Sequence, residues 1–200
     1  FSNIFVQSYI NFFGENCMSG WTTYAKVDQL LFLPMQSIAL ASTTFVGQNL
    51  GAGHHDRVKK GVGFGIACSC LMAELVGLIS YIFAPQLIGF FSETPEAIDF
   101  GVRHMRTICL FYCLLAFSHC IAGIMRGAGK ATVPMFTMLA CWCVIRVTYI
   151  TIAVKLVNEL TTVSWAYPIT WTCSSIIFLI YFLKADWIHN FDRNEKGLTH

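Results

Sequence analysis

The residues of this chain that could do chemistry are charged groups set inside apolar runs. Arg146 falls within CVIRVTY and Glu74 within LMAELVG. A charge near the centre of a membrane span costs at least about 2.5–3.5 kcal/mol on insertion scales, so each group needs a cavity or a partner. Arg146, with Trp142 and Tyr149 on the same helical face, either has a structural role or lines a polar pathway. Glu74 either carries a proton or cation, or is protonated or paired with another helix.

Polar side chains also recur near the start of the chain. Asn3, Gln7 and Asn11 are spaced i, i+4, i+8, which places them on one face of a helix. Such a face lines a water-filled cavity or supplies hydrogen bonds between helices. Asp28 either joins the same cavity or lies at the membrane interface.

Aromatic residues make up 14% of the chain, so most of them must pack or anchor helices at the interface. Tyr112, Tyr167 and Trp171 could also stack on a flat cation through their π faces. We therefore take Glu74 as the candidate ion-coupling residue. The candidate substrate-binding residues are Gln7, Asn11, Asp28, Tyr112, Arg146 and Tyr149.

No pattern indicates catalysis, a metal site or a cofactor. The nine cysteines include i, i+2 pairs, such as Cys68 with Cys70, whose thiols point apart on a helix. No zinc-type spacing accompanies them. His119 stands alone within an apolar run, so an enzyme is not predicted, and we interpret the cysteines as small packing residues.

The composition excludes a soluble domain. Hydrophobic residues make up 56% of the chain, charged residues only 12%, and the mean hydropathy is +0.59. Soluble domains carry about 25% charged residues. The formal net charge of +2 gives no basic stripe for a nucleic acid. Membrane lipid is therefore the expected surrounding.

Runs of about 20 apolar residues predict membrane-spanning helices. We expect an all-α, polytopic bundle of about six, over residues 1–14, 22–50, 58–84, 100–125, 132–155 and 163–184. These form one transmembrane lobe, 1–184, and 185–200 is a cytoplasmic tail. Lys and Arg near the helix ends are distributed eight to four, which places the turns near 51–60 and 126–131 in the cytoplasm. The uncharged start of the chain suggests a cut within a longer protein.

Two of these turns share one pattern, VGQNLGAG followed by basic residues and MRGAGK followed by Pro134. Gly51, Gly53, Gly127 and Gly129 suit positive φ angles or the close approach of two backbones. The sequence GAGK is too short for a nucleotide-binding loop and follows no strand.

In order and spacing these features resemble the multidrug and toxic compound extrusion (MATE) family. They comprise the proline-containing helix LFLPMQSIALASTTF leading into VGQNLGAG, the MRGAGK turn, and Arg146 in the next helix. The stretch FVQSYINFFGEN also resembles the close of the family's seventh helix. The resemblance implies half of a twelve-helix, two-lobe antiporter, here the C-terminal lobe. It would sit in the plasma membrane, which for a bacterial protein is the inner membrane.

The resemblance further implies export of organic cations or amphipathic drugs in exchange for Na⁺ or H⁺ by alternating access. The partner would be the missing N-terminal lobe, and the lobe alone should not transport. The segment LFYCLLAFSHC lacks the acid that family members with a cation site carry in the tenth helix. The alternative is a flippase of similar fold for lipid-linked oligosaccharides, which should hold more basic groups deep in its spans than Arg146.

Overall fold

The described part of the chain is all-α. The computed structural model describes residues 6–8, 10, 14–156 and 160–185, with the side chains of 154–161 left aside. The helices, in chain order, are α2 (Glu15–Gly51), α3 (His55–Ile82), α4 (Ala84–Gly89), α5 (Pro95–Ile108), η2 (Cys109–Phe111), α6 (Tyr112–Gly127), α7 (Thr132–Leu139), η3 (Ala140–Ile145), α8 (Arg146–Leu156) and α9 (Leu160–Lys184). Here η2 is a 3₁₀ turn and η3 is π-helical.

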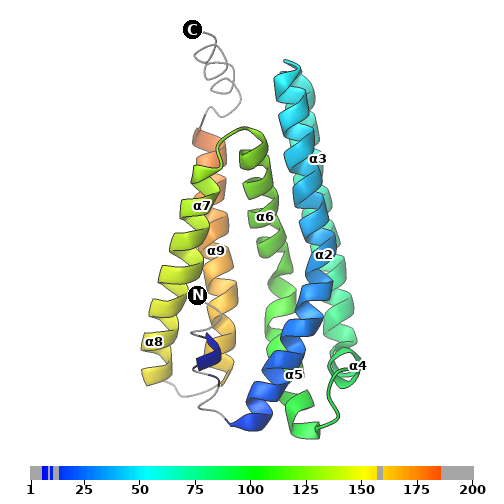
Figure 1. Cartoon of the computed structure of the whole chain (residues 1–200), viewed down its shortest axis with the longest axis vertical. Coiled ribbons are helices and arrows are strands. Elements are labelled where there is room, and N and C mark those ends of the chain that lie inside the picture. Colours follow the sequence, from blue (N-terminus) through cyan, green and yellow to red (C-terminus); the bar gives the residue numbers. More distant parts are fainter. Residues whose placement is uncertain (1–5, 9, 11–13, 157–159, 186–200) are drawn as a thin grey trace.

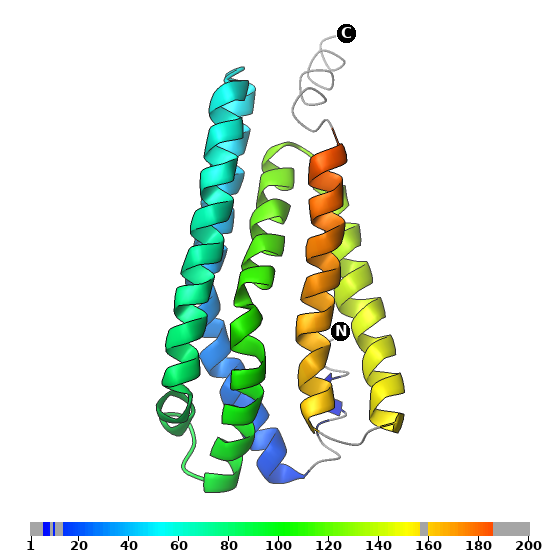
Figure 2. The same ribbon diagram turned by 180° about the vertical axis from the view of Figure 1, so that it is seen from behind.

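The long helices run roughly along the long axis of the molecule, and the short α4 lies across it (Figures 1 and 2). α2 and α3 form an antiparallel hairpin on one side, and α7–η3–α8 pairs with α9 on the other. α5 and α6 stand between the two pairs and contact α2, α3 and α9. The described helices therefore form one bundle, here called the lobe, with α6 at its centre.

Five helical stretches in the described residues are long and apolar enough to cross a membrane. They are Glu15–Gly51, His55–Ile82, Pro95–Gly127, Thr132–Ala153 and Thr162–Lys184. The helix expected over residues 1–14 lies largely outside the described residues. The second helix begins at Glu15, not at residue 22, because the break falls at Gly14 (φ 97°). Gly20 does not break it, because it packs against the backbone of Ala97 in α5.

Many large apolar side chains lie on the outside of the lobe. Leu40, Phe64 and Leu183 are more than half exposed, as suits a surface in contact with hydrocarbon. α6 differs from the outer helices, because every residue from Cys120 to Met125 is buried. A helix buried on all sides is the core of its bundle.

Two glycines let α2 and α6 approach closely. A Cβ added at Gly123 would collide with the carbonyl oxygen of Ala39, and one at Gly127 with that of Thr43. Thr43 Oγ1 also donates a hydrogen bond of 2.9 Å to the Gly123 carbonyl. Small residues and interhelical hydrogen bonds are the usual basis of helix packing in lipid.

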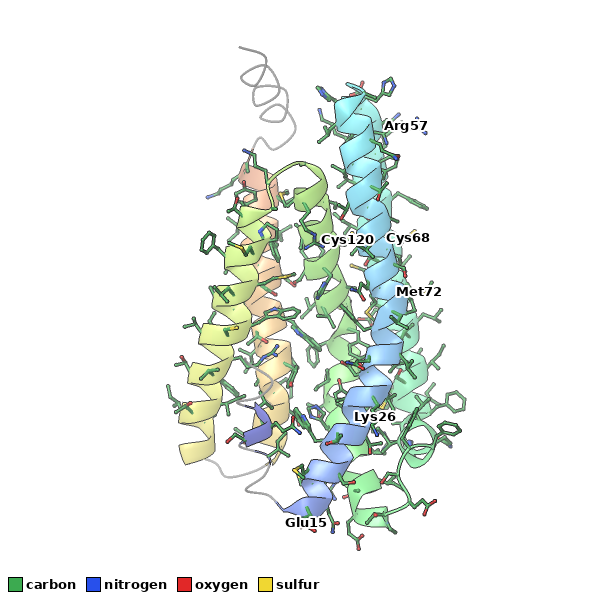
Figure 3. The ribbon with its side chains drawn as sticks, viewed as in Figure 1. Glu15, Lys26, Arg57, Cys68, Met72 and Cys120 are labelled. Carbon is green, nitrogen blue, oxygen red and sulfur yellow. The ribbon has the colours of Figure 1, made fainter. Side chains whose placement is uncertain are left out.

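Both glycine turns end their helices in the same way. Gly53 and Gly129 each have φ 73°. His54 N donates to Asn49 O, and Lys130 N donates to Met125 O, both at 2.8 Å. These bonds, with a shorter one inside each, form two Schellman motifs. Arg57 lies next to the first motif, at the end of the bundle opposite Glu15 and Lys26 (Figure 3).

Candidate functional site

A carboxylate on α2 lies against two tyrosines inside the lobe. The hydroxyls of Tyr24 and Tyr112 donate hydrogen bonds of 2.9 and 2.6 Å to the same oxygen of Asp28, Oδ1. Both tyrosines are buried, and Asp28 is half-buried. Among the described residues no Lys or Arg forms an ion pair with Asp28. The second oxygen, Oδ2, is left without a hydrogen bond from that part of the chain.

Helical spacing brings Tyr24 to Asp28, and packing between two helices brings Tyr112 there. Tyr24 lies one helical turn before Asp28 on α2, at the spacing that lets two side chains meet. Tyr112 is the first residue of α6, directly after the 3₁₀ turn η2. The close crossing of α2 and α6 then brings Tyr112 onto Asp28, 84 residues away in sequence.

Aromatic rings from four helices extend from this carboxylate across the lobe. Tyr24 stands edge-on to His104 at 4.4 Å between ring centroids, and Tyr112 lies 6.2 Å from Trp171. Tyr167 lies 5.8 and 5.9 Å from His104 and Trp171, respectively. We call these residues, with Trp21, the aromatic belt: Trp21, Tyr24, His104, Tyr112, Tyr167 and Trp171.

Arg146 lies at the far end of the belt. It is the first residue of α8, follows the π-helical segment, and is only 3% exposed. Its Nη2 donates to Thr170 Oγ1 at 3.0 Å, and Thr170 in turn donates to the Tyr167 carbonyl. The guanidinium carbon lies 4.2 Å from the Tyr167 ring centroid and 5.6 Å from that of Trp142. Arg146 is thus held by aromatic faces and one hydroxyl.

The structure brings together only some of the residues singled out from sequence. Asp28 and Tyr112 touch, and Arg146 reaches them through the belt. Tyr149 is half-buried and packs in a cluster with Val163 and Ala166, which also contains Trp21 and Tyr167 of the belt. Gln7 is exposed, and Asn11 lies outside the described residues, so the polar stripe stays a prediction.

Glu74 lies apart from this group. It is exposed on α3 and forms no hydrogen bond with Asp28, Tyr24 or Tyr112. Its role as the ion-coupling residue stays a prediction.

Sequence reasoning missed several residues that complete the site. Tyr24 had a usable signal, because a tyrosine four residues before an aspartate on a helix can hydrogen-bond it. No sequence signal pointed to the pair of His104 and Ser164, because 60 residues separate them. Their Nδ1 and Oγ atoms lie 2.7 Å apart. Thr170 had no signal either, because it meets Arg146 only through the packing of α8 on α9.

The arrangement suits a cation better than a metal-dependent reaction. The described residues hold no group of three or more His, Cys, Asp or Glu side chains that could bind a metal ion. A half-buried carboxylate beside aromatic faces offers charge and π surface together, which organic cations prefer. The same carboxylate can also take a small inorganic cation or a proton.

Comparison with known proteins places the chain in a family. The MatE family model matches residues 1–152. A probable multidrug resistance protein NorM of Thermotoga maritima is 31% identical over 130 residues, covering 64% of this chain and 28% of that protein. The probable multidrug resistance protein YpnP of Bacillus subtilis is 26% identical over 138 residues, covering 68% and 31%. The chain therefore matches about a third of the length of these relatives.

Solved structures agree on the fold. The MATE transporter ClbM in complex with Rb⁺ superposes with a TM-score of 0.87 at 19% identity, over 97% of this chain and 45% of that one. A MATE structure in complex with MaD3S gives 0.85 at 12% identity, over 92% and 41%. The predicted all-α membrane bundle is confirmed by this likeness and by the five long apolar helices. Since the family model covers more than half of its residues, the chain belongs to the MatE family, whose members are multi-pass membrane transporters and not enzymes.

Proposed function

We propose that this chain is the C-terminal lobe of a multidrug exporter that exchanges organic cations or amphipathic drugs for Na⁺ or H⁺. Support comes from the family and from relatives described as multidrug resistance proteins. The chain covers 41–45% of two transporters of the same fold, so a second lobe would complete the pathway. The two lobes would open alternately to either side of the membrane.

The Asp28 centre is the observation that carries this proposal. Two tyrosine hydroxyls point at one carboxylate oxygen, and hydrogen bonds of this kind stabilise the ionised form. A charge taken out of water without a partner is costly, so the centre favours a bound cation. An organic cation and a coupling ion would compete for Asp28. Because only one of them can bind at a time, export of the drug would be coupled to entry of the ion.

An exposed polar face on α2 supports a water-filled space beside this lobe. Thr22, Gln29 and Gln36 are exposed and seven residues apart, so they lie on one side of the helix. Amide groups in contact with lipid would lack hydrogen-bond partners. We therefore place this face of α2 toward the second lobe and the drug pathway.

The test uses the full-length parent protein with tetraphenylphosphonium as the probe. We expect Asp28→Asn to weaken probe binding by at least tenfold, since losing one member of a buried charge pair costs about 2–5 kcal/mol. Tyr112→Phe should give a smaller loss. In proteoliposomes, a Na⁺ gradient and a pH gradient are imposed separately, and one of them should drive probe uptake by the wild type only.

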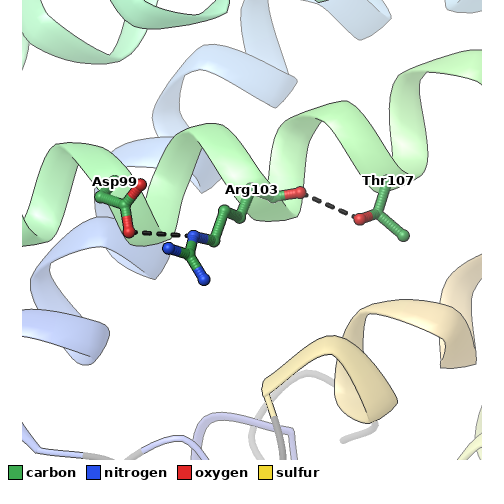
Figure 4. Close-up of polar contacts among 3 residues, drawn as sticks. All are labelled: Asp99, Arg103 and Thr107. Atoms are coloured by element: carbon green, nitrogen blue, oxygen red, sulfur yellow. Dashed lines mark hydrogen bonds and ion pairs between the residues drawn. The ribbon is translucent and has the colours of Figure 1, made fainter.

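Asp99→Asn is the matched control. Asp99 lies on α5, is exposed, and pairs with Arg103 at 2.9 Å, while Thr107 bonds the Arg103 carbonyl (Figure 4). An exposed i, i+4 pair contributes little, so binding and uptake should stay at wild-type values. Gradient-driven uptake by Asp28→Asn at the wild-type rate would contradict the proposal.

A further inference from the structure

Three buried nitrogen atoms without hydrogen-bond partners belong to neighbouring side chains at the Arg146 end of the belt. Among the described residues, Nε of Arg146, Nε1 of Trp142 and Nε2 of His119 are all buried and unpaired. The His119 and Trp142 rings are 5.3 Å apart, and the guanidinium carbon of Arg146 lies 5.6 Å from the Trp142 ring centroid. Since buried polar atoms are nearly always satisfied, three together need an explanation.

The charge of Arg146 also lacks a partner. Its contacts are the Thr170 hydroxyl and the faces of Tyr167 and Trp142, all neutral groups. Within the described ranges no carboxylate pairs with it, and Asp28 is reached only through the rings of the belt. A buried charge without a counter-ion is strongly destabilising. An anion from outside these residues would remove that cost.

One N–H of Arg146 remains available. Nη2 is bound to Thr170 and the guanidinium packs against two aromatic rings, while Nε has no hydrogen-bond partner in the described part of the chain. A guanidinium N–H donates well to a carboxylate oxygen, and the unpaired indole N–H of Trp142 is a further donor.

The backbone gives an independent indication. Trp142 lies within the π-helical segment Ala140–Ile145, and Arg146 follows it directly. Short π-helical segments inside α-helices are frequent at functional sites.

We propose that Arg146, Trp142 and His119 form an anion subsite that binds the carboxylate of a zwitterionic amphiphile whose cationic group lies at Asp28. The belt between the two charges is a chain of aromatic rings, suited to the flat apolar body of such a molecule. The inference rests on the proposed function and narrows its substrate class. A free inorganic anion such as chloride is the other possible source of the same charge.

The test compares two dyes that differ at one group, using the full-length parent in detergent micelles. Rhodamine 110 carries a free carboxylate, and rhodamine 123 is its methyl ester. Wild type should bind rhodamine 110 about tenfold more tightly, since a hydrogen bond to a charged group contributes about 1.5–3 kcal/mol. Arg146→Gln should abolish this preference by weakening rhodamine 110 alone. Trp142→Phe, which keeps an aromatic ring but loses the donor, should reduce it several-fold.

Arg106→Gln is the matched control, because Arg106 also lies over an aromatic ring, that of Tyr81 at 5.4 Å, but is exposed. The Arg106→Gln variant should still bind rhodamine 110 more tightly than rhodamine 123. Retained binding of rhodamine 123 shows that a variant is folded. If Arg146→Gln binds neither dye, that variant is uninformative about the anion subsite and Trp142→Phe provides the test. A Trp142→Phe variant that prefers rhodamine 110 as strongly as wild type does would then overturn the inference.

Exchanging chloride for gluconate separates the two sources of the anion. Competition by chloride against rhodamine 110 alone supports the subsite. If wild type prefers neither dye, and chloride changes its affinity for both dyes equally, the substrate assignment is wrong. The subsite would then bind an inorganic anion. Wild type that binds rhodamine 123 without preferring rhodamine 110 refutes this inference only. Wild type that binds neither dye refutes the proposed function.

Discussion

The crossing of α2 and α6 at Gly123 should be intolerant of a single methyl group. A Cβ at this position collides with the Ala39 carbonyl oxygen and lies 3.0 Å from Thr43 Oγ1, so the helices must separate. Overpacking of this kind costs about 1–3 kcal/mol. The hydrogen bond from Thr43 to the Gly123 carbonyl is then strained, and such bonds contribute about 0.6 kcal/mol in membrane proteins.

Gly63→Ala is the matched control. Gly63 lies on α3, and a Cβ there meets nothing within 4 Å. Replacing an unhindered helical glycine by alanine stabilises a helix by about 0.5–1 kcal/mol. The same propensity gain offsets part of the Gly123→Ala cost of overpacking and of the strained hydrogen bond, so we expect a net loss of about 0.6–3 kcal/mol there. The two substitutions should therefore differ in sign.

The assay is unfolding of the full-length parent by sodium dodecyl sulfate in mild detergent micelles, followed by tryptophan fluorescence. Gly123→Ala should unfold at a lower denaturant fraction than wild type, and Gly63→Ala at the same or a higher one. Because the crossing also holds Asp28 against Tyr112, Gly123→Ala should bind tetraphenylphosphonium more weakly. Equal stability of the two alanine variants would refute the reasoning, since then no close contact exists at Gly123.

Two further predictions concern the predicted coupling residue and a turn. Glu74→Gln should slow ion-driven uptake in proteoliposomes and leave equilibrium binding of tetraphenylphosphonium unchanged, because Glu74 lies away from Asp28; unaltered uptake would remove Glu74 from coupling. Gly53→Ala should lower stability by about 1–2 kcal/mol in the same denaturant titration, because φ 73° is strained for alanine. Gly51→Ala, where a Cβ meets nothing and φ is not positive, is its control, and equal effects would contradict this account.

The turns were predictable from sequence because their causes are local. A glycine followed by basic residues at the end of an apolar run specifies a helix end within a few residues. Gly53 and Gly129 accordingly adopt the positive φ angles expected of such positions. The start of α2 was expected at residue 22, whereas the helix begins at Glu15. Gly20 lies inside it, and its lack of a side chain serves a contact with Ala97 of α5, 77 residues further along, which no local pattern indicates.

The partners of the polar residues were not predictable in the same way. Asp28 and Tyr112 were singled out separately, and only the crossing of α2 and α6 joins them. Arg146 was expected to share a face with both Trp142 and Tyr149. The structure gives it contacts with Trp142 and, from α9, with Tyr167 and Thr170. Tyr149 packs with Val163 and Ala166. The contacts from α9 join residues more than 20 positions apart, so the sequence pattern around Arg146 could not predict them.

The sequence by itself determined that hydrocarbon surrounds this chain and approximately where each described span ends. Both depend on runs of residue types that act over one or two helical turns. Only the tertiary structure decided which face of each helix is buried, because lipid and protein core accept the same apolar side chains. In water, a polar face would have indicated the outside; in a membrane that signal is weak, so contacts between distant helices had to be seen.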